Sequence, residues 1–442
     1  MNETIVNSEE TVALPQERSR KNTIRAWVVC LSAALFFFYE FIQMNMFNAI
    51  SSELMVDFHL NAFELGRLSS FYFISNVIFL FPAGILLDRY SARNIILISM
   101  GICIIGTASF AMTASPQWAM LFRFLMGIGS AFCFLSVIRL STRWFPSARL
   151  ALVTGVVATM AMLGGIASQT PLMWLVQVFH WRTALLLDAL FGILIFFVVM
   201  LFVEDYPNHF RAQHEREKKH IHTMGYWKSI GFAFLKLQNW FGGIYTCLMN
   251  LPISLLGGIW GVLFLVTAHH IPKVEATYIT STLFFGTAVG GPLVGWICDR
   301  IGRRRLPMLV GCAISLVFVL SIIYVPDLSF IGLLILFFMI GFTTSVQIIG
   351  YPTVAENSIP AITAMSVSVV NITTMGGQAI FQPLFGKLMD LHAGKMAVIA
   401  RHYSAADFHW AMMIFPIAFI IAGIAVYCLR ESYCQSREKS TS

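Results

Sequence analysis

The chain has 442 residues, of which 57% are hydrophobic and only 12% are charged, whereas soluble globular proteins devote about a quarter of their residues to charged side chains. This composition excludes a soluble globular protein. The net charge of +7 comes from Lys and Arg near the ends of apolar runs, and the eight cysteines form no CxxC pair, so we expect neither nucleic-acid binding nor a disulfide or zinc framework.

Apolar runs of about 20 residues recur along the whole chain. At 1.5 Å per residue such a run crosses a hydrocarbon core of roughly 30 Å, and in lipid it must be a helix because its backbone groups can bond only to one another. The sequence therefore predicts an all-α membrane protein with twelve transmembrane helices, at 26–50, 67–87, 94–113, 117–140, 151–175, 182–203, 239–268, 277–297, 306–324, 329–351, 361–389 and 408–429. No cleavable signal pattern is present, so we expect the first span to be retained.

Lys and Arg are distributed unevenly over the segments between these spans. With a cytoplasmic N-terminus, 21 of the 29 Lys and Arg residues lie on the cytoplasmic side and six lie outside. The positive-inside rule therefore predicts that both termini are cytoplasmic, and we expect the location to be a bacterial inner membrane. We interpret the His- and Lys-rich stretch 214–222 as a solvated linker rather than a metal or nucleic-acid site.

Several markers occur twice along the chain at one nearly constant spacing. They are GILLDRYSAR at 84–93 and GWICDRIGRR at 295–304, Gly129 and Gly341, Gly164–Gly165 and Gly376–Gly377, and Pro171 and Pro383. This duplication predicts two pseudo-symmetric six-helix bundles. The predicted divisions are an N-terminal tail 1–25, a first bundle 26–203, a cytoplasmic linker 204–238, a second bundle 239–429 and a C-terminal tail 430–442. Paired bundles with a site between them are typical of alternating-access transporters.

The repeated loop resembles the signature loop of the major facilitator superfamily, as GxxxDRxxxR at 84–93 and GxxxDRxGRRR at 295–305. RFLMGIGSA at 123–131 resembles the RxxxGxG motif of that superfamily's fourth helix, and the resemblance covers essentially the whole chain. Four shorter stretches are similar to the phagosomal nutrient carriers of intracellular bacteria: FFFYEF near 36, LSSFYF after 67, RWFP at 143–146 and AMLGG at 161–165. One departure from the superfamily pattern is Ser91–Ala92, where the first loop lacks the second Gly and the following Arg.

The two loops predict a cytoplasmic gate. Asp88 and Asp299 stand at helix C-termini, where the macrodipole disfavours an anion unless a cation or another helix N-terminus compensates it. The resemblance implies that Asp88 faces span eleven and a cation at the end of span four, which is either Arg139 or Arg143. It also implies that this contact closes the cytoplasmic side in the outward-open state. The candidate gating residues are Asp88, Arg89, Arg93, Arg139, Arg143, Asp299, Arg300, Arg303 and Arg304. Positive-inside anchoring alone would explain the arginines but not the two aspartates.

Three ionisable residues, Glu40, Arg123 and Asp188, lie deep inside spans, where charge is costly and usually functional. Glu40 in span one and Arg123 in span four fall at the same depth, about 21 Å from the cytoplasmic boundary. The resemblance places both spans at the central cavity, so the two side chains are candidates either for a proton-coupling pair or for a static buried ion pair. Asp188 in span six lies at a similar depth, as a scaffold partner or a competitor for Arg123.

Substrate contacts are expected from polar groups near the midplane of the cavity helices. The candidates are Gln43, Asn45, Asn250, Thr343, Thr344 and Gln347. Asn250 lies in a span interrupted by Gly and Pro, which exposes backbone dipoles. Alternatively, each Thr or Asn bonds only to its own helix backbone.

These features predict a secondary active transporter, not an enzyme, that moves a small polar nutrient such as an amino acid by proton-coupled alternating access. The alternatives are an importer of an organic anion or iron-carboxylate siderophore, and a transport-dead membrane sensor on the same scaffold. Ser168–Gln169 stands where an antiporter-type fifth helix would carry Gly-Pro, which favours import. No GxxxxGK[ST] loop is present, so we expect no ATP drive. We expect no cofactor and no metal, a monomer, and as partners a small-molecule substrate, H⁺ and the lipid bilayer, but no nucleic acid.

Overall fold

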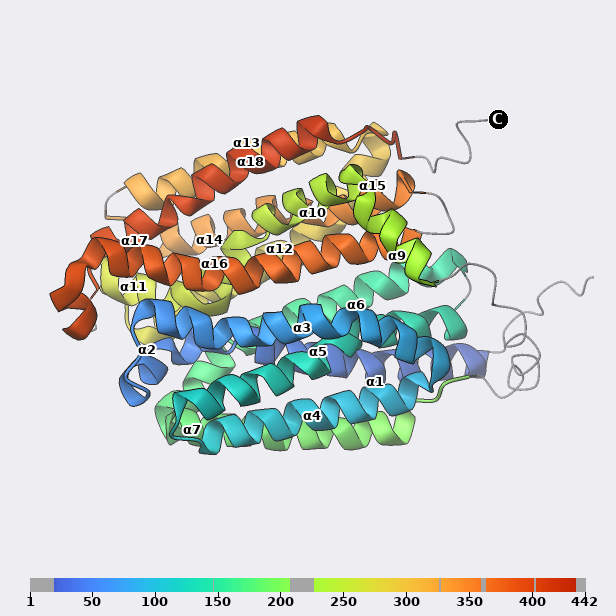
Figure 1. The fold of residues 1–442 in the computed structure, drawn as a ribbon, viewed down its shortest axis with the longest axis horizontal. Helices are drawn as coiled ribbons and strands as arrows, with labels where there is room; N and C mark the ends of the chain where they lie inside the picture. Colours follow the sequence, from blue (N-terminus) through green and yellow to red (C-terminus); the bar gives the residue numbers. More distant parts are fainter. Residues whose placement is uncertain are drawn as a thin grey trace, which may run out of the picture.

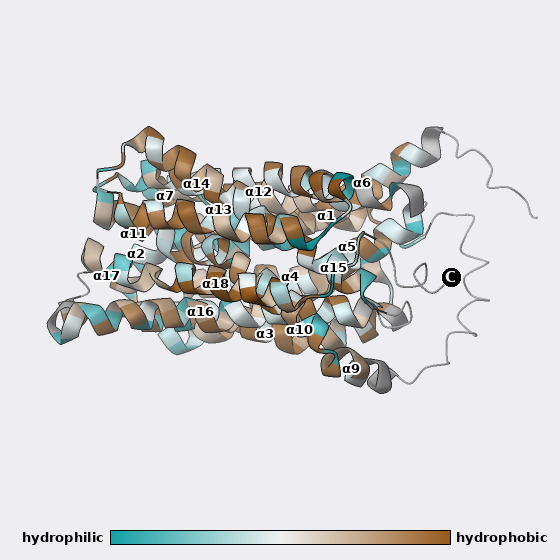
Figure 2. Ribbon diagram, turned by 90° about the horizontal axis from the view of Figure 1, so that it is seen from above, coloured by the Kyte–Doolittle hydropathy of each residue, from teal (hydrophilic) through white to brown (hydrophobic). Residues whose placement is uncertain are grey.

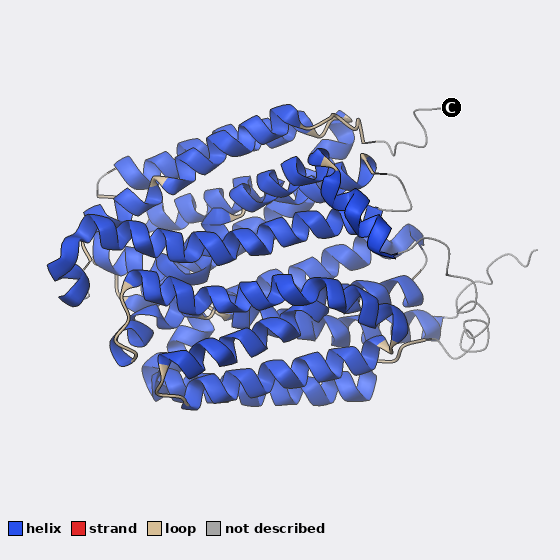
Figure 3. Ribbon diagram, viewed as in Figure 1, coloured by secondary structure: helices blue, strands red, loops and turns tan. Residues whose placement is uncertain are grey.

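A computed structural model describes residues 20–145, 147–206, 226–325, 327–358, 363–400 and 403–434. The described residues are almost entirely helical and contain no strand (Figure 3). The elements are α1 (Arg20–Asn45), α2 (Phe47–Asp57), α3 (Ala62–Arg89), α4 (Ala92–Met112), α5 (Pro116–Trp144), α6 (Ser147–Ala167), α7 (Thr170–Phe202), α9 (Tyr226–Leu235), α10 (Leu237–Met249), the π-helix η1 (Ile253–Trp260), α11 (Gly261–His269), α12 (Lys273–Ile301), α13 (Arg305–Tyr324), α14 (Phe330–Thr344), the 3₁₀ helix η2 (Ser345–Ile349), α15 (Gly350–Glu356), α16 (Thr363–Ala400), α17 (Ala405–Met412) and α18 (Ile414–Cys428).

The helices form two sets that repeat one packing pattern. In the N-terminal set, α1–α7, α3 packs against α5, α4 packs against α5 and α7, and α1 packs against α6. In the C-terminal set, α10–α18, the corresponding contacts are α12 with α14, α13 with α14 and α18, and α10 with α16. Between the sets, α3 packs along α16 and α6 packs against α12, and Figure 1 shows α3 and α16 side by side. The fold is therefore the predicted all-helical membrane architecture with a duplicated bundle.

Apolar side chains cover the middle of the helices. In Figure 2 hydrophobic residues predominate along the helices, and hydrophilic ones gather mainly near their ends. Among the described residues, nine helical stretches are long and apolar enough to cross a membrane, and the bent pair formed by α10 with η1 and α11 makes a tenth. The predicted spans five and six fall within a single stretch, Leu152–Phe202. The predicted span eleven falls in α16, where Asn371, Gln378 and Gln382 lower the hydropathy, so the number twelve stays a prediction.

Helix ends are set by local capping signals. Asn61 and Glu64 form a capping box at the start of α3, and Ser404 and Asp407 form another at the start of α17. In each box the side chains satisfy N–H groups that have no partner within the helix. The described part of the predicted linker 204–238 is not all irregular, because it contains α9. The His- and Lys-rich stretch 214–222 lies outside the described residues.

We call the end of the molecule where α1 begins and α18 ends the terminal end, and the opposite end the distal end. In Figure 1 the terminal end is on the right, and α2, α11 and α17 mark the distal end on the left.

Candidate functional site

A cluster of buried amide groups joins the two helix sets near the distal end. Asn48 of α2 donates from Nδ2 to Oε1 of Gln169 at 2.6 Å and accepts at Oδ1 from the backbone N–H of Val262 at 3.0 Å. Gln169 also accepts from Thr280 Oγ1 at 2.8 Å and donates to the carbonyl of Gly257 at 3.1 Å. Each of these side chains is buried. The cluster therefore ties α2 and the α6–α7 turn to η1, α11 and α12.

The residues of this cluster lie at or near interruptions of the helices. The chain breaks at Met46 between α1 and α2, at Ser168–Gln169 between α6 and α7, and in the π-helix η1. At such breaks backbone groups lose their regular partners and become available to side chains. A group of hydrogen bonds between the two sets lies toward the distal end, together with the ion pair of Lys273 with Glu53 at 2.5 Å. The sets are therefore closed against each other at that end.

Glu40 lies deep in the N-terminal set with one carboxylate oxygen unpaired. Its side chain is 2% exposed, and Oε2 accepts from the Tyr72 hydroxyl at 2.6 Å. The Ser130 hydroxyl lies 2.8 Å from Tyr72 Oη, and its oxygen accepts from the Asn76 side-chain amide at 3.0 Å. Glu40 Oε1 is buried and has no hydrogen-bond partner. A hydroxyl chain thus leads from a buried acid on α1 to the half-buried Ser130 on α5.

Arg123 does not form the expected ion pair with Glu40. Its two terminal nitrogens donate to the carbonyls of Gln43 at 2.6 Å and Met44 at 3.3 Å. These carbonyls belong to the last turn of α1, where no intrahelical donor remains and the macrodipole is negative. The guanidinium also lies over the rings of Phe47, at 4.4 Å, and Tyr72, at 4.6 Å. The break at Met46, which span arithmetic did not anticipate, thus recruits Arg123 as a cap for α1.

Asp188 meets neither Arg123 nor Glu40 directly. Its carboxylate accepts a hydrogen bond from the side-chain amide of Gln43, and the Gln43 carbonyl oxygen Oε1 accepts from Thr107 at 3.0 Å. The backbone oxygen of Gln43 accepts from Arg123. Gln43, expected to contact substrate, therefore acts as a bridge between Arg123 and Asp188.

The other predicted substrate residues fall into two groups. Asn45, Thr343 and Thr344 are buried and donate to carbonyls of their own helices, and Thr343 also accepts from the Ser315 hydroxyl at 2.9 Å. Asn250 and Gln347 are half-buried, and their side-chain amides have no described hydrogen bond. They lie on neighbouring segments, because Thr246, one turn before Asn250, donates to the Gln347 carbonyl at 3.2 Å.

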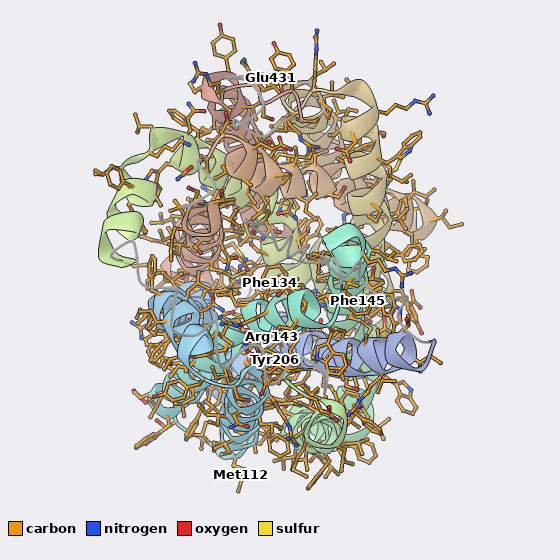
Figure 4. The ribbon with its side chains drawn as sticks, turned by 90° about the vertical axis from the view of Figure 1, so that its right-hand side faces the viewer. Met112, Phe134, Arg143, Phe145, Tyr206 and Glu431 are labelled. Carbon is orange, nitrogen blue, oxygen red and sulfur yellow. The ribbon has the colours of Figure 1, made fainter. Side chains whose placement is uncertain are left out.

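At the terminal end, a carboxylate after α7 organises the first signature loop. Asp205 accepts from the Ser91 hydroxyl and from the backbone N–H of Arg93, at 3.2 Å for the latter, and pairs with Arg143 at 3.1 Å. The Arg143 guanidinium also lies 4.3 Å from the ring centroid of Tyr206 (Figure 4). The side chains of Asp88 and Arg89 lie outside the described residues, so their predicted gating contacts stay predictions, as does that of Arg139.

The second signature loop is built around Arg304. Arg304 pairs with Asp299 at 3.0 Å and with Glu356 at 2.7 Å, and its backbone N–H donates to Glu431 at 2.8 Å. Burial alone would lower the pKa of Arg304, but the hydrogen bonds and charge of Glu356 outweigh it and raise that pKa above its usual value. The predicted Asp299 and Arg304 are therefore brought together. By contrast, Arg303 is exposed, and Arg300 lies over the Trp296 ring at 5.3 Å.

The two loops share one contact that the sequence repeat implies. The backbone N–H of Arg93 donates to Asp205, and that of Arg304, at the equivalent position of the second repeat, donates to Glu431 at 2.8 Å. In both sets a carboxylate that follows the last helix holds the signature loop.

Sequence reasoning did not single out the polar residues Tyr72, Asn76, Ser130, Asn48 and Thr280. The only sequence feature that could have identified them is a polar side chain within an apolar span, but such side chains are common and usually bond to their own helix. Gln169 did carry a signal, because Ser168–Gln169 departs from a pattern of the superfamily.

Comparisons with known proteins agree with this architecture. The uncharacterized transporter YybO of Bacillus subtilis (strain 168) is 26% identical over 179 residues, which are 40% of this chain and 41% of that protein, so the chain covers about two fifths of this relative. The hexuronate transporter of the same organism is 25% identical over 151 residues, 34% of this chain and 36% of that protein. The crystal structure of a bacterial homologue of the human lysosomal transporter Spinster, inward-facing and unoccupied, matches with a TM-score of 0.70 at 18% identity, over 92% of this chain and 98% of that one.

The family comparison covers nearly the whole chain. The model of the Major Facilitator Superfamily matches residues 32–253 and residues 242–441. Together with the fold, this match shows that the chain belongs to the Major Facilitator Superfamily and is a secondary transporter of that kind.

Proposed function

We propose that the protein imports an amino acid together with protons, as a monomer in a bacterial inner membrane with both termini in the cytoplasm. The observation that carries proton coupling is Glu40, a buried acid with an unpartnered oxygen and no cation within ion-pair distance among the described residues. An acidic side chain inside a membrane protein is by default a functional group, and proton relays use such groups.

The contacts of Glu40 suggest how a proton changes helix packing. Glu40 on α1 bonds to Tyr72 on α3, and Tyr72 bonds to Ser130 on α5. Gaining or losing a proton changes what the carboxyl group can accept or donate, so it alters the bonds that hold these three helices together. In the proposed orientation the distal end faces outward, so this closed distal end corresponds to a state that faces the cytoplasm.

Two observations support an amino acid as substrate. The short motifs similar to phagosomal nutrient carriers favour a small nutrient, and Asn250 and Gln347 offer half-buried amides without described side-chain partners. An amide has both a carbonyl acceptor and an NH₂ donor. It can therefore bond to the ammonium and to the carboxylate of an amino acid.

An organic anion, including an iron-carboxylate siderophore, is the second candidate. One relative is named a hexuronate transporter, and hexuronate is an organic anion. Against this, Arg123 already spends both terminal nitrogens on carbonyls of α1. The amino acid therefore stays the first choice.

A ligand screen on the purified protein tests this choice. Thermal unfolding would be followed with amino acids, peptides, nucleosides, organic acids and ferric carboxylate chelates, since a ligand that prefers the folded state raises its apparent stability. We expect stabilisation by one group of amino acids, followed by their uptake into proteoliposomes. Stabilisation by organic acids or ferric chelates alone would replace the amino acid by the second candidate. Binding without any flux would identify a sensor.

A further inference from the structure

The first turn of α3 is capped partly from the other helix set. Within α3's own sequence, Asn61 accepts from the backbone N–H of Glu64 at 2.8 Å, and Glu64 accepts from that of Asn61 at 2.9 Å. The next donors turn to the C-terminal set. The backbone N–H of Ala62 donates to the Tyr403 hydroxyl at 2.9 Å, and that of Phe63 donates to Asp390 at 3.0 Å.

Asp390 and Tyr403 are fixed to each other. The Tyr403 hydroxyl donates to the second carboxylate oxygen of Asp390 at 2.6 Å. Burial and this hydrogen bond raise the pKa of Tyr403 above its usual value, so the hydroxyl stays a donor across the physiological range. A carboxylate at a helix N-terminus is also favoured by the macrodipole. The two residues therefore present one acceptor unit to the start of α3.

The backbones of α3 and α16 touch beside this cap. A Cβ atom on Gly66 would lie 2.6 Å from the carbonyl oxygen of Gln382, and one on Gly386 would collide with the carbonyl of Ala62. The cap thus lies beside a backbone-to-backbone contact of the two sets, and it cannot persist if α3 and α16 separate at the distal end.

We infer that Asp390 and Tyr403 are a latch that closes the distal end by capping α3 of the opposite set, and that this latch is released whenever that end opens. The inference rests on the proposed function only for the assignment of the distal end to the outside. The latch itself follows from contacts between the two sets.

Asp88, near the C-terminus of α3, is the counterpart of Asp390 on the antiparallel helix α16. The stretch from Ala62 to Asp88 on α3 is as long as the stretch from Ala364 to Asp390 on α16. Because every residue of an α-helix adds the same rise along the axis, Asp88 stands in the same register to the first turn of α16 as Asp390 does to the first turn of α3. The gate expected for Asp88 at the terminal end and the Asp390 latch are then two ends of one pair of helices. A tilt that forms one contact breaks the other.

Distances between spin labels test the latch directly. Labels would be placed through a non-canonical keto amino acid, so that the eight native cysteines stay in place. One pair, at Met112 and Ile331, reports on the distal end, and a second pair, at Tyr90 and Leu306, reports on the terminal end. All four side chains are exposed. The substitutions are Asp390→Asn and Tyr403→Phe, alone and combined.

We expect the combined variant to raise the population with a longer distal distance and a shorter terminal distance by about tenfold. The substitutions remove capping bonds that only the state with a closed distal end makes, so they destabilise that state alone. Asn61→Ala is the matched control, since it removes a cap that α3 carries within its own set. It should lower thermal stability without changing the ratio of the two populations. An unchanged ratio in the combined variant, with normal thermal unfolding, would overturn the latch. The readout needs no substrate, so it stays informative even if the screen for amino acids fails.

Discussion

Arg123 shows how a buried charge can be structural where its position suggests chemistry. Its depth in the fourth predicted span matches that of Glu40, and depth is all that a sequence can give. The structure shows that α1 ends beside it and leaves carbonyls to be satisfied. Helix ends inside a span cannot be read from hydropathy, because the break at Met46 lies within the predicted span 26–50 and not at the end of an apolar run.

Replacing Arg123 therefore tests a structural role. We expect Arg123→Gln to lower the free energy of unfolding by about 2–4 kcal/mol, since it leaves buried carbonyls unsatisfied and removes the contacts with two aromatic rings. Thermal unfolding of the purified protein measures the effect. Arg182→Gln, which changes a half-buried arginine near the distal end, is the control and should change the melting temperature much less. A melting temperature for Arg123→Gln equal to that of the control would remove the capping role.

Glu40 is the residue on which proton coupling depends. We expect Glu40→Gln to abolish accumulation driven by a pH gradient, because the amide cannot take up and release the coupled proton. It should leave exchange of labelled for unlabelled substrate at more than about a third of the wild-type rate, since the amide can still accept from Tyr72. Proteoliposomes allow both assays on one preparation.

The control for this substitution is Glu275→Gln, which changes an exposed acid at the start of α12. It should preserve both activities. Loss of accumulation and exchange together in a folded Glu40→Gln protein would favour a structural role for Glu40.

At the scale of helices, the repeated glycine pairs make equivalent contacts with their order reversed. A Cβ atom on Gly164 would meet the carbonyl of Phe38 in the same set, and one on Gly165 would meet Phe284 of the other set. In the second repeat Gly377 faces Cys247 within its set, whereas Gly376 lies nearest to Val77 across the interface. The sequence repeat could predict that the pairs pack helices closely, but not which glycine faces which helix, because that depends on helix rotation.

The close backbone contact between α16 and α3 gives a further prediction. In Gly386→Ala the new methyl group would collide with the backbone of Ala62 and Phe63, which cannot move aside cheaply. We expect transport to fall at least tenfold, even though alanine favours a helix by about 1 kcal/mol over glycine. Initial uptake rates at equal protein density provide the measurement.

Gly423→Ala is the matched substitution, because a Cβ atom there meets nothing within 4 Å. Its transport rate should equal that of the wild type. Full activity in Gly386→Ala would mean that α3 and α16 need not approach as closely as they do here.

At the scale of the whole molecule, the sequence predicted the helical class, the superfamily and the duplication. These follow from apolar run length and from markers repeated at one spacing, such as the two signature loops. It did not predict the broken helices at Met46 and Ser168–Gln169 or the amide cluster that they supply. Which polar groups meet depends on how two separate helix sets are tilted against each other, and a single sequence holds no direct record of that tilt.

The measurement closest to the central claim is the movement of protons with substrate in a reconstituted system. Proteoliposomes with a pH-sensitive dye inside, and no imposed gradient, would receive a sudden external addition of the amino acid found in the screen. The account predicts internal acidification that follows substrate entry and is absent in Glu40→Gln. Substrate entry without any change in internal pH, in vesicles shown to hold a proton gradient, would contradict it.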